Sequence, residues 1–239
     1  MSSTIPLLVL ALLAGASVPL GALVSSRPRL ARLCLRHELD SLVSYLGGGA
    51  LLAAIALVLV PFGMEQLRIP AAALAFLTGG IAFWLLNGWL KRRGGSGAQY
   101  AGMLLDFFPE ALLLGASGAS DPRLAALLAL LIAVQNMPEG FAAYQELRSG
   151  GMRQPRLWPL LLLAPLVGPG AAWLGESFFS SHEAVLAGIT LFCSGGILYL
   201  IFDDIVPAAH LEHRDYPALG AVSGFLVGIV GTMVVHGAG

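Results

Sequence analysis

Long runs of apolar residues, each about 20 residues in length, constrain the fold of this chain more than any other feature of its sequence. A run of about 20 apolar residues crosses roughly 30 Å of hydrocarbon when it is helical. Only 11% of the 239 residues are charged, whereas a soluble protein carries about 25%. These runs also lack the polar face that a helix on a soluble core requires. The sequence therefore predicts an all-α, polytopic membrane protein.

We predict eight transmembrane helices that form a single transmembrane domain over residues 1–239. The first apolar run has no Lys or Arg ahead of it and four Arg after it, so we interpret it as a retained spanning helix rather than a cleaved secretory signal. The connections are short, which leaves little mass outside the bilayer. The predicted spans are residues 4–25, 41–63, 69–91, 97–118, 122–147, 157–177, 183–209 and 215–237.

The distribution of basic residues predicts the orientation in the membrane. Arg68 and Arg123 lie in even-numbered loops, which leaves 11 of the 13 Lys and Arg residues in odd-numbered loops or at the span ends beside them. Because positive charge marks the cytoplasmic side, we expect both termini to lie outside the cytoplasm, with the protein in the cell (inner) membrane. The formal net charge of −1 gives no reason to expect a nucleic-acid partner. The partner that the composition implies is the lipid bilayer.

Two Pro-Glu elements stand in neighbouring spans, each with a polar residue four positions before the Glu. Asp106 precedes Glu110 in one span, and Gln135 precedes Glu139 in the next. Residues four positions apart lie on the same face of a helix. Only a few residues connect the two spans, so we expect antiparallel neighbours whose polar faces converge. These four side chains would together form one site rich in oxygen atoms.

Acidic residues within the predicted spans have no basic partner in the sequence. Every Lys and Arg lies in a loop or at a span end, whereas the acidic residues Asp106, Glu110, Glu139, Asp203 and Asp204 fall within spans. Charged groups inside a membrane are costly, which makes them functional candidates by default. Either these carboxylates are protonated or a cation from outside the sequence neutralises them. A divalent metal ion or a transported proton fits this requirement.

The ligand chemistry at the two Pro-Glu elements favours a divalent cation without selecting one element. Pro109 and Pro138 have no amide hydrogen, so the carbonyl groups four residues earlier lose their usual helical donor. Carboxylate, amide and carbonyl oxygens without a thiolate suit divalent cations in general. Cys34 and Cys193 are distant in sequence, and we expect both to be single, inert thiols.

Asp203 and Asp204, toward the end of the seventh predicted span, form a second acidic group. Adjacent helical residues point about 100° apart, so only one of them can face a given pathway. We interpret one of the two as a pathway residue, and the alternative is a solvated helix end. No phosphate-binding loop, zinc-protease signature or nucleophile elbow is present, so we do not expect an enzyme.

Residues 135–140, Gln-Asn-Met-Pro-Glu-Gly, resemble the fifth-helix motif of the ZIP (ZRT/IRT-like) family of divalent-metal transporters, particularly its bacterial GufA-like branch. The seventh span is also similar to that of the family, where residues 195–199 lead to Asp203 and Asp204. The similarity extends from about the second span to the eighth. It implies a ZIP-like 3+2+3 arrangement of the eight helices and a homodimer.

The resemblance also implies which residues bind the metal. The first metal position of the family maps onto the four residues of the Pro-Glu elements, and Asn136 belongs to a second position. The predicted metal ligands are thus Asp106, Glu110, Gln135, Glu139 and Asn136.

Departures from the family motifs change this expectation. In the fourth-helix motif Asp106 replaces His, and Phe107, which cannot bind a metal, replaces Asn. In the sixth helix the chain has Ala164 where the family usually has Glu. We therefore predict one transport site rather than a binuclear centre. Replacing His by Asp favours manganese or iron(II) relative to zinc, although zinc and cadmium would still bind.

The function that the resemblance implies is transport of divalent cations, namely Zn or else Mn, Fe or Cd, toward the cytoplasm, with no prosthetic group. A moving bundle of spans one, four, five and six would carry the site past the other four spans. The alternative is a metal-binding, sensing or scaffold membrane protein of transporter descent with little or no flux. A third hypothesis, an intramembrane enzyme with Asp106 and Glu110 as an acid/base pair, lacks any substrate-binding motif to support it.

Overall fold

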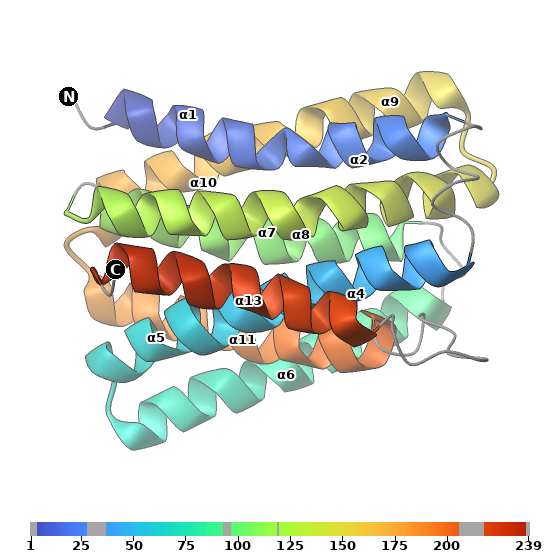
Figure 1. The fold of residues 1–239 in the computed structure, drawn as a ribbon. Coiled ribbons are helices and arrows are strands. Elements are labelled where there is room, and N and C mark those ends of the chain that lie inside the picture. Colours follow the sequence, from blue (N-terminus) through green and yellow to red (C-terminus); the bar gives the residue numbers. More distant parts are fainter. Residues whose placement is uncertain (1–3, 28–36, 93–96, 119, 206–217, 238–239) are drawn as a thin grey trace.

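Helices aligned along one axis form an elongated bundle in the computed structural model (Figure 1). The structure describes residues 4–27, 37–92, 97–118, 120–205 and 218–237. Within these ranges there is no strand, which confirms the all-α prediction. Cys34 and the segments 206–209 and 215–217 of the predicted spans lie outside the described residues, and Cys193 is a free thiol.

Each predicted span corresponds to one helix or to a series of helices that follow one another directly. The first three are α1 (Thr4–Gly15) with α2 (Ser17–Ser26), α4 (His37–Ala54) with η1 (Ile55–Leu59) and α5 (Val60–Gln66), and α6 (Ile69–Arg92). The fourth and fifth are α7 (Ala98–Gly118) and α8 (Pro122–Ser149). The last three are α9 (Gln154–Leu163) with η2 (Ala164–Leu166), α10 (Val167–Leu174) and η3 (Gly175–Phe179), then α11 (Glu183–Leu200) with η4 (Ile201–Ile205), and α13 (Ala218–Val235).

Seven of these spans in the described part of the chain are long and apolar enough to cross a membrane, so the protein is a multi-pass membrane protein. The remaining one, α7, is 21 residues long but carries Asp106 and Glu110, which lower its hydropathy. It runs the length of the bundle beside α8 (Figure 1). The start of α1 and the end of α13 lie at the same end of the bundle, as an even number of passages requires. This agrees with the predicted eight helices.

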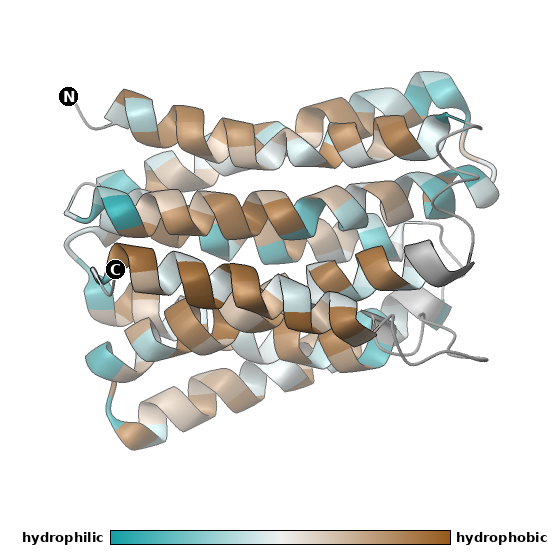
Figure 2. Cartoon of the chain, viewed as in Figure 1, coloured by the Kyte–Doolittle hydropathy of each residue, from teal (hydrophilic) through white to brown (hydrophobic). Residues whose placement is uncertain are grey.

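Polar residues gather at the two ends of the bundle, whereas most of its length is apolar (Figure 2). Local sequence signals explain several of these ends. At the start of α8, the Asp121 carboxylate accepts hydrogen bonds of 3.0 Å from the backbone N–H groups of Arg123 and Leu124, which is a standard N-cap. Beyond its other end, Gly151 adopts a positive φ of 85°, which favours glycine and turns the chain toward α9.

Three of the spans contain a π-helical segment, namely η1, η3 and η4. A further irregularity, the 3₁₀ segment η2, contains Pro165 and divides the sixth span. Short π-helical segments inside long helices often mark functional sites. Sequence periodicity does not predict any of these interruptions, because they shift the register by a single residue.

The helices pack as two groups. The first group contains α1, α2, α7, α8, α9 and α10, with α2 and α7 packed along α8 and α10 packed along α7. The second group contains α4, α5, α6, α11 and α13, in which α4 packs along α13 and α6 packs along α11. Contacts between the groups run mainly from α8 to α4 and from α7 to α11. The first group corresponds to spans one, four, five and six.

Glycines allow the closest of these helix contacts. A Cβ atom added at Gly79 of α6 would meet the backbone oxygen of Phe192 on α11, and one added at Gly195 would meet that of Phe76 in return. Gly224 of α13 faces α4 in the same way, through the Leu46 carbonyl group. In a membrane, helix association depends on such close packing because lipid supplies no hydrophobic driving force.

Gly79→Ala is expected to lower the stability of the α6/α11 pair, because overpacking costs about 1–3 kcal/mol. Gly88→Ala on the same helix is the matched control, since nothing lies within 4 Å of a Cβ at that position. Thermal unfolding of the purified protein in detergent measures both. Equal melting temperatures for the two variants would contradict the packing described here.

Candidate metal site between α7 and α8

The two Pro-Glu elements meet in the interior of the bundle. The Gln135 side-chain nitrogen Nε2 on α8 donates a hydrogen bond of 2.5 Å to Oε2 of Glu110 on α7. Both side chains are fully buried, with exposed fractions of 0% and 1%. This contact confirms that the polar faces of the two helices converge. Both helices continue through their prolines, Pro109 and Pro138.

The other two predicted ligands lie one helical turn away on the same helices. Asp106 precedes Glu110 on α7 and is 4% exposed, while Glu139 follows Gln135 on α8 and is half-buried. The carboxylates of Asp106 and Glu110 lie within electrostatic range of Glu139. The structure thus brings the four residues of the first predicted metal position into one region of the interior.

Several oxygen atoms in this region have no hydrogen-bond partner. Glu110 Oε1, Gln135 Oε1 and Glu139 Oε2 are buried and unpartnered. A carboxylate oxygen and an amide oxygen can accept but not donate, and buried acceptors without a partner are costly. A cation is the chemical species that such a set of oxygens accommodates.

The carboxylates do not form a closed chelate in this conformation. Among the described residues, no group of three or more His, Cys, Asp or Glu side chains stands close enough to hold a metal ion. The hydrogen bond between Gln135 and Glu110 occupies one oxygen that a cation would use. Binding a cation there requires the Gln135 amide to turn its oxygen rather than its nitrogen toward the site.

Asn136, the predicted second-position ligand, is fully buried on α8, and neither its side-chain nitrogen nor its oxygen has a partner. It follows Gln135 directly, so it points about 100° away around the helix. Its side chain forms no hydrogen bond to the other four residues, and its role as a ligand stays a prediction.

Phe107 fills the space between α7, α1 and the sixth span. Its side chain is fully buried. A Cβ atom at Gly15 would lie 2.8 Å from Phe107 Cζ and 2.9 Å from Pro165 Cα, and one at Gly168 would lie 2.6 Å from the same Cζ. An aromatic ring packed against two glycines leaves this region apolar, which favours one cation position over two.

Asp203 lies on η4, away from the four site residues. It accepts a hydrogen bond of 2.9 Å from the side chain of Asn87 on α6, and it lines a shallow cavity with a volume of about 410 Å³. Cys193 on α11 lies within electrostatic range of Asp106 and Glu110. Asp203 follows Cys193 by ten residues, a distance of about 15 Å along the helix. Asp204 also belongs to η4, but its side chain lies outside the described part of the chain.

Asn87, which is buried with an exposed fraction of 5%, was not among the site residues predicted from the sequence. An amide inside an apolar span is costly, and this signal could have identified it. Sequence analysis also did not explain Gly140, the last residue of the α8 motif. A Cβ atom there would meet the Val18 carbonyl oxygen on α2, so this glycine is required for helix packing.

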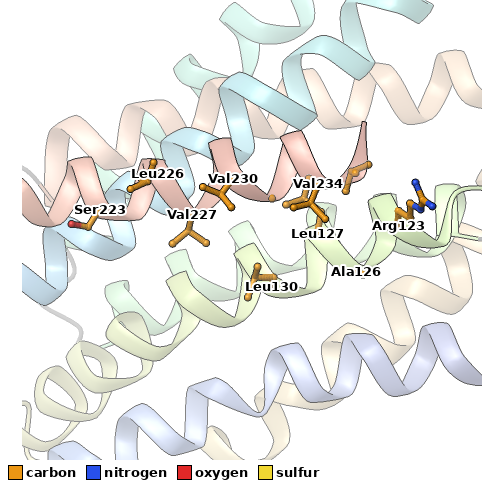
Figure 3. Close-up of a pocket in the computed structure, with 11 residues that line it drawn as sticks. Arg123, Ala126, Leu127, Leu130, Ser223, Leu226, Val227, Val230 and Val234 are labelled. Atoms are coloured by element: carbon orange, nitrogen blue, oxygen red, sulfur yellow. The ribbon is translucent and has the colours of Figure 1, made fainter. Parts of the chain in front are cut away.

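A separate groove lies on the outside of the bundle between α8 and α13, with a volume of about 850 Å³ (Figure 3). Aliphatic side chains such as Leu127, Leu130 and Val230 line most of it, with Arg123 at one end. None of the predicted site residues contributes to its lining. The groove is therefore not part of the candidate metal site.

Comparison with known proteins supports the predicted resemblance. The chain is 32% identical over 130 residues to a protein named zinc transporter GufA from Myxococcus xanthus. The aligned region covers 54% of this chain and 51% of the relative, so the chain matches about half the length of that protein. No protein-family model matches the sequence. The predicted resemblance to a GufA-like transporter is thereby confirmed over this part of the chain.

Gln135→Leu is expected to destabilise the protein by about 1–3 kcal/mol, because it leaves the buried Glu110 carboxyl group without its donor. The double variant Glu110→Leu with Gln135→Leu is expected to recover most of this loss, since both partners are then apolar. Thermal unfolding without added metal measures the double-mutant cycle. If the stability changes of the two single variants simply add in the double variant, the hydrogen bond between the two residues does not contribute to stability.

Proposed function

We propose that this chain transports divalent metal cations across the membrane through one site formed by Asp106, Glu110, Gln135 and Glu139. The main support for this proposal is that buried acceptor oxygens from α7 and α8 converge in the interior of the bundle. Glu110 and Gln135 are in direct contact, and their remaining oxygens and that of Glu139 have no partner. A passing cation supplies the positive charge that the surrounding helices lack.

The placement of the basic residues supports this proposal. Among the described residues, every Lys and Arg lies in a loop or at a helix end, away from the carboxylates inside the spans. A charged side chain at the centre of a membrane helix costs about 3 kcal/mol. A divalent cation offsets this cost for two carboxylates at once. A protein that only needed stability would replace such residues with apolar ones.

Zinc is the first cargo that the comparison suggests, because the similar Myxococcus xanthus protein is named a zinc transporter. The oxygen-only ligand set, with Asp106 in place of a His, extends the expected range to manganese, iron(II) and cadmium. We also propose that the cation moves toward the cytoplasm.

The division into two helix groups supports a mechanism with alternating access. The first group carries all four proposed ligands, and α8 and α7 face α4 and α11 of the second group. At this boundary a Cβ atom on Gly47 of α4 would lie 3.2 Å from the ring of Pro138. Small residues permit helices to slide past one another. Movement of the first group against the second would expose the site to each side of the membrane in turn.

We further propose a homodimer with both termini outside the cytoplasm. Among the seven apolar spans of the described chain, the two least buried are α6 and α13, where 11% and 17% of an 18-residue stretch is buried, and both belong to the second group. Lipid or a second copy of the chain covers their apolar faces. A dimer formed there would hold the second group still while the first group moves.

Glu139→Ala and Glu110→Ala are each expected to reduce metal uptake at least about tenfold, since even outer-shell changes at metal sites cost about 10–100-fold in affinity. Uptake into proteoliposomes that contain the purified protein measures this effect. Glu65→Ala is the control, because Glu65 is exposed at the end of α5, a helix that carries none of the proposed ligands. Unchanged uptake in folded Glu139→Ala and Glu110→Ala protein would overturn the proposal.

Asp106→His is expected to shift the preference of the transporter toward zinc, because imidazole nitrogen is a better ligand for zinc than for manganese. Competition between the two ions in the same uptake assay measures the ratio. If Asp106→His leaves the ion profile of the wild type unaltered, Asp106 is not a ligand.

The alternative function is a metal-binding or sensing membrane protein with little flux. The apolar packing of Phe107, where the resemblance implies a second metal position, favours this alternative. Tight binding of metal to the purified protein without any uptake into liposomes would support it over transport.

A further inference from the structure

Another cavity, lined by both polar and apolar side chains, lies between the two helix groups, at the end of the bundle where α1 begins and α13 ends. Its volume is about 240 Å³. The first group contributes residues at the end of α7 and beyond η3, and the second group contributes residues from α5 and the start of α11. The polar residues that line it are Ser117, Ser120, Ser180 and Glu183. None of these residues belongs to the candidate metal site.

The three hydroxyl groups of this cavity act as acceptors toward anything inside it. Ser117 donates its hydrogen to the Leu113 carbonyl group at 2.6 Å, and Ser180 donates to the Glu176 carbonyl group at 2.7 Å. Ser120 likewise donates to the Ser117 carbonyl group, at 2.9 Å. Because each hydroxyl hydrogen is already used, the oxygens present only lone pairs to a ligand. This arrangement suits a cation and disfavours an anion.

Negative charge predominates around the cavity. Glu183 adds a carboxylate at the start of α11. The α7 helix ends at Gly118 and η3 ends at Phe179, so two helix C-termini, which carry partial negative charge, point toward this end of the bundle. The N-terminus of α11 carries the opposite partial charge, and the adjacent Glu183 carboxylate offsets it.

The cavity is aligned with the candidate metal site along α7. Ser117 follows Glu110 by seven residues, which places both on nearly the same face about 10 Å apart. The turn between them carries Leu113 and Leu114, both fully buried. The cavity and the site are thus separated by apolar side chains in this structure. Because both helix groups line the cavity, a movement of one against the other changes its connection to the site.

We propose that this cavity is an outer vestibule, a weak divalent-cation site that collects the ion before it reaches Glu110 and Glu139. The inference rests on the proposed function and on the proposed orientation, which places this end of the bundle outside the cytoplasm. The ligands are the Glu183 carboxylate and the hydroxyl oxygens of Ser117, Ser120 and Ser180. One carboxylate with neutral oxygens gives weak binding, which lets the ion leave again.

The first test is uptake of Mn²⁺ by whole cells that produce the full-length chain, in which the orientation is uniform. Glu183→Gln is expected to raise the apparent KM for Mn²⁺ about threefold to tenfold and to leave the maximal rate within about twofold. The Glu183 carboxylate attracts the ion, but it does not contribute to the inner site at Glu110 and Glu139. Raising the ionic strength should increase the KM of the wild type more than that of Glu183→Gln. Glu183→Asp, which keeps the charge, and Glu65→Gln, which removes another exposed carboxylate at this end, should resemble the wild type.

The second test measures binding and does not depend on flux. Protein with Glu110→Ala and Glu139→Ala, which removes the inner site, should retain one weak Mn²⁺ site with a dissociation constant of about 0.1–1 mM in electron paramagnetic resonance titrations. Adding Glu183→Gln should abolish this site, whereas adding Glu65→Gln should not.

The two tests separate the vestibule from the transport function. If wild-type cells take up neither Zn²⁺ nor Mn²⁺, Fe²⁺ or Cd²⁺ but the weak Mn²⁺ site disappears with Glu183→Gln, the transport proposal fails and the cation-binding cavity stands. If uptake depends on Glu110 while Glu183→Gln alters neither the KM nor the weak binding, the vestibule is wrong and transport stands.

Discussion

Carboxylates buried in the middle of a membrane bundle impose the constraint on which the rest of this structure depends. Glu110 and Glu139 lie among apolar helices, and every Lys and Arg in the described part of the chain lies in a loop or at a helix end. Each such charge costs about 3 kcal/mol in a membrane helix. The hydrogen bond from Gln135 offsets only part of this for Glu110. The remaining cost makes the interior between α7 and α8 a place that favours cations.

The packing around this region holds the polar helices in place while leaving a boundary along one side. On one side of α8, Gly140 and Gly21 bring α2 into backbone contact. On the other side, a Cβ atom on Gly47 of α4 would lie 3.2 Å from the ring of Pro138 and 3.7 Å from the Gln135 carbonyl oxygen, which is a looser contact with the backbone of α8. Close backbone packing on one side and side-chain contact on the other fit a group of helices that moves as a unit. The site then travels with the first group, and the vestibule changes shape because both groups line it.

Much of the fold could be predicted from the sequence because the membrane imposes simple rules on length and composition. The apolar runs predicted the spans, and the four-residue spacing in the Pro-Glu elements predicted which residues share a face. The contact between Glu110 and Gln135 followed from that spacing and from the short turn between α7 and α8. In each of these cases the information is local to one helix or one turn.

Features that depend on distant parts of the chain could not be predicted in the same way. The bond between Asn87 and Asp203 joins residues 116 positions apart, and helical periodicity does not specify which faces of α6 and η4 meet. The break after Gly15 and the π-helical segments change the register by one residue without a sequence signal. The vestibule combines residues from four separate elements, none of which is unusual alone.

Anomalous X-ray diffraction from crystals grown with Cd²⁺ locates the bound ion without any assumption about flux. We predict that the strongest anomalous peak lies between α7 and α8, within coordination distance of carboxylate oxygens of Glu110 and Glu139. A strongest peak elsewhere, for example beside Asp203 and Asn87, or the absence of any peak between the two helices at saturating Cd²⁺, would contradict it.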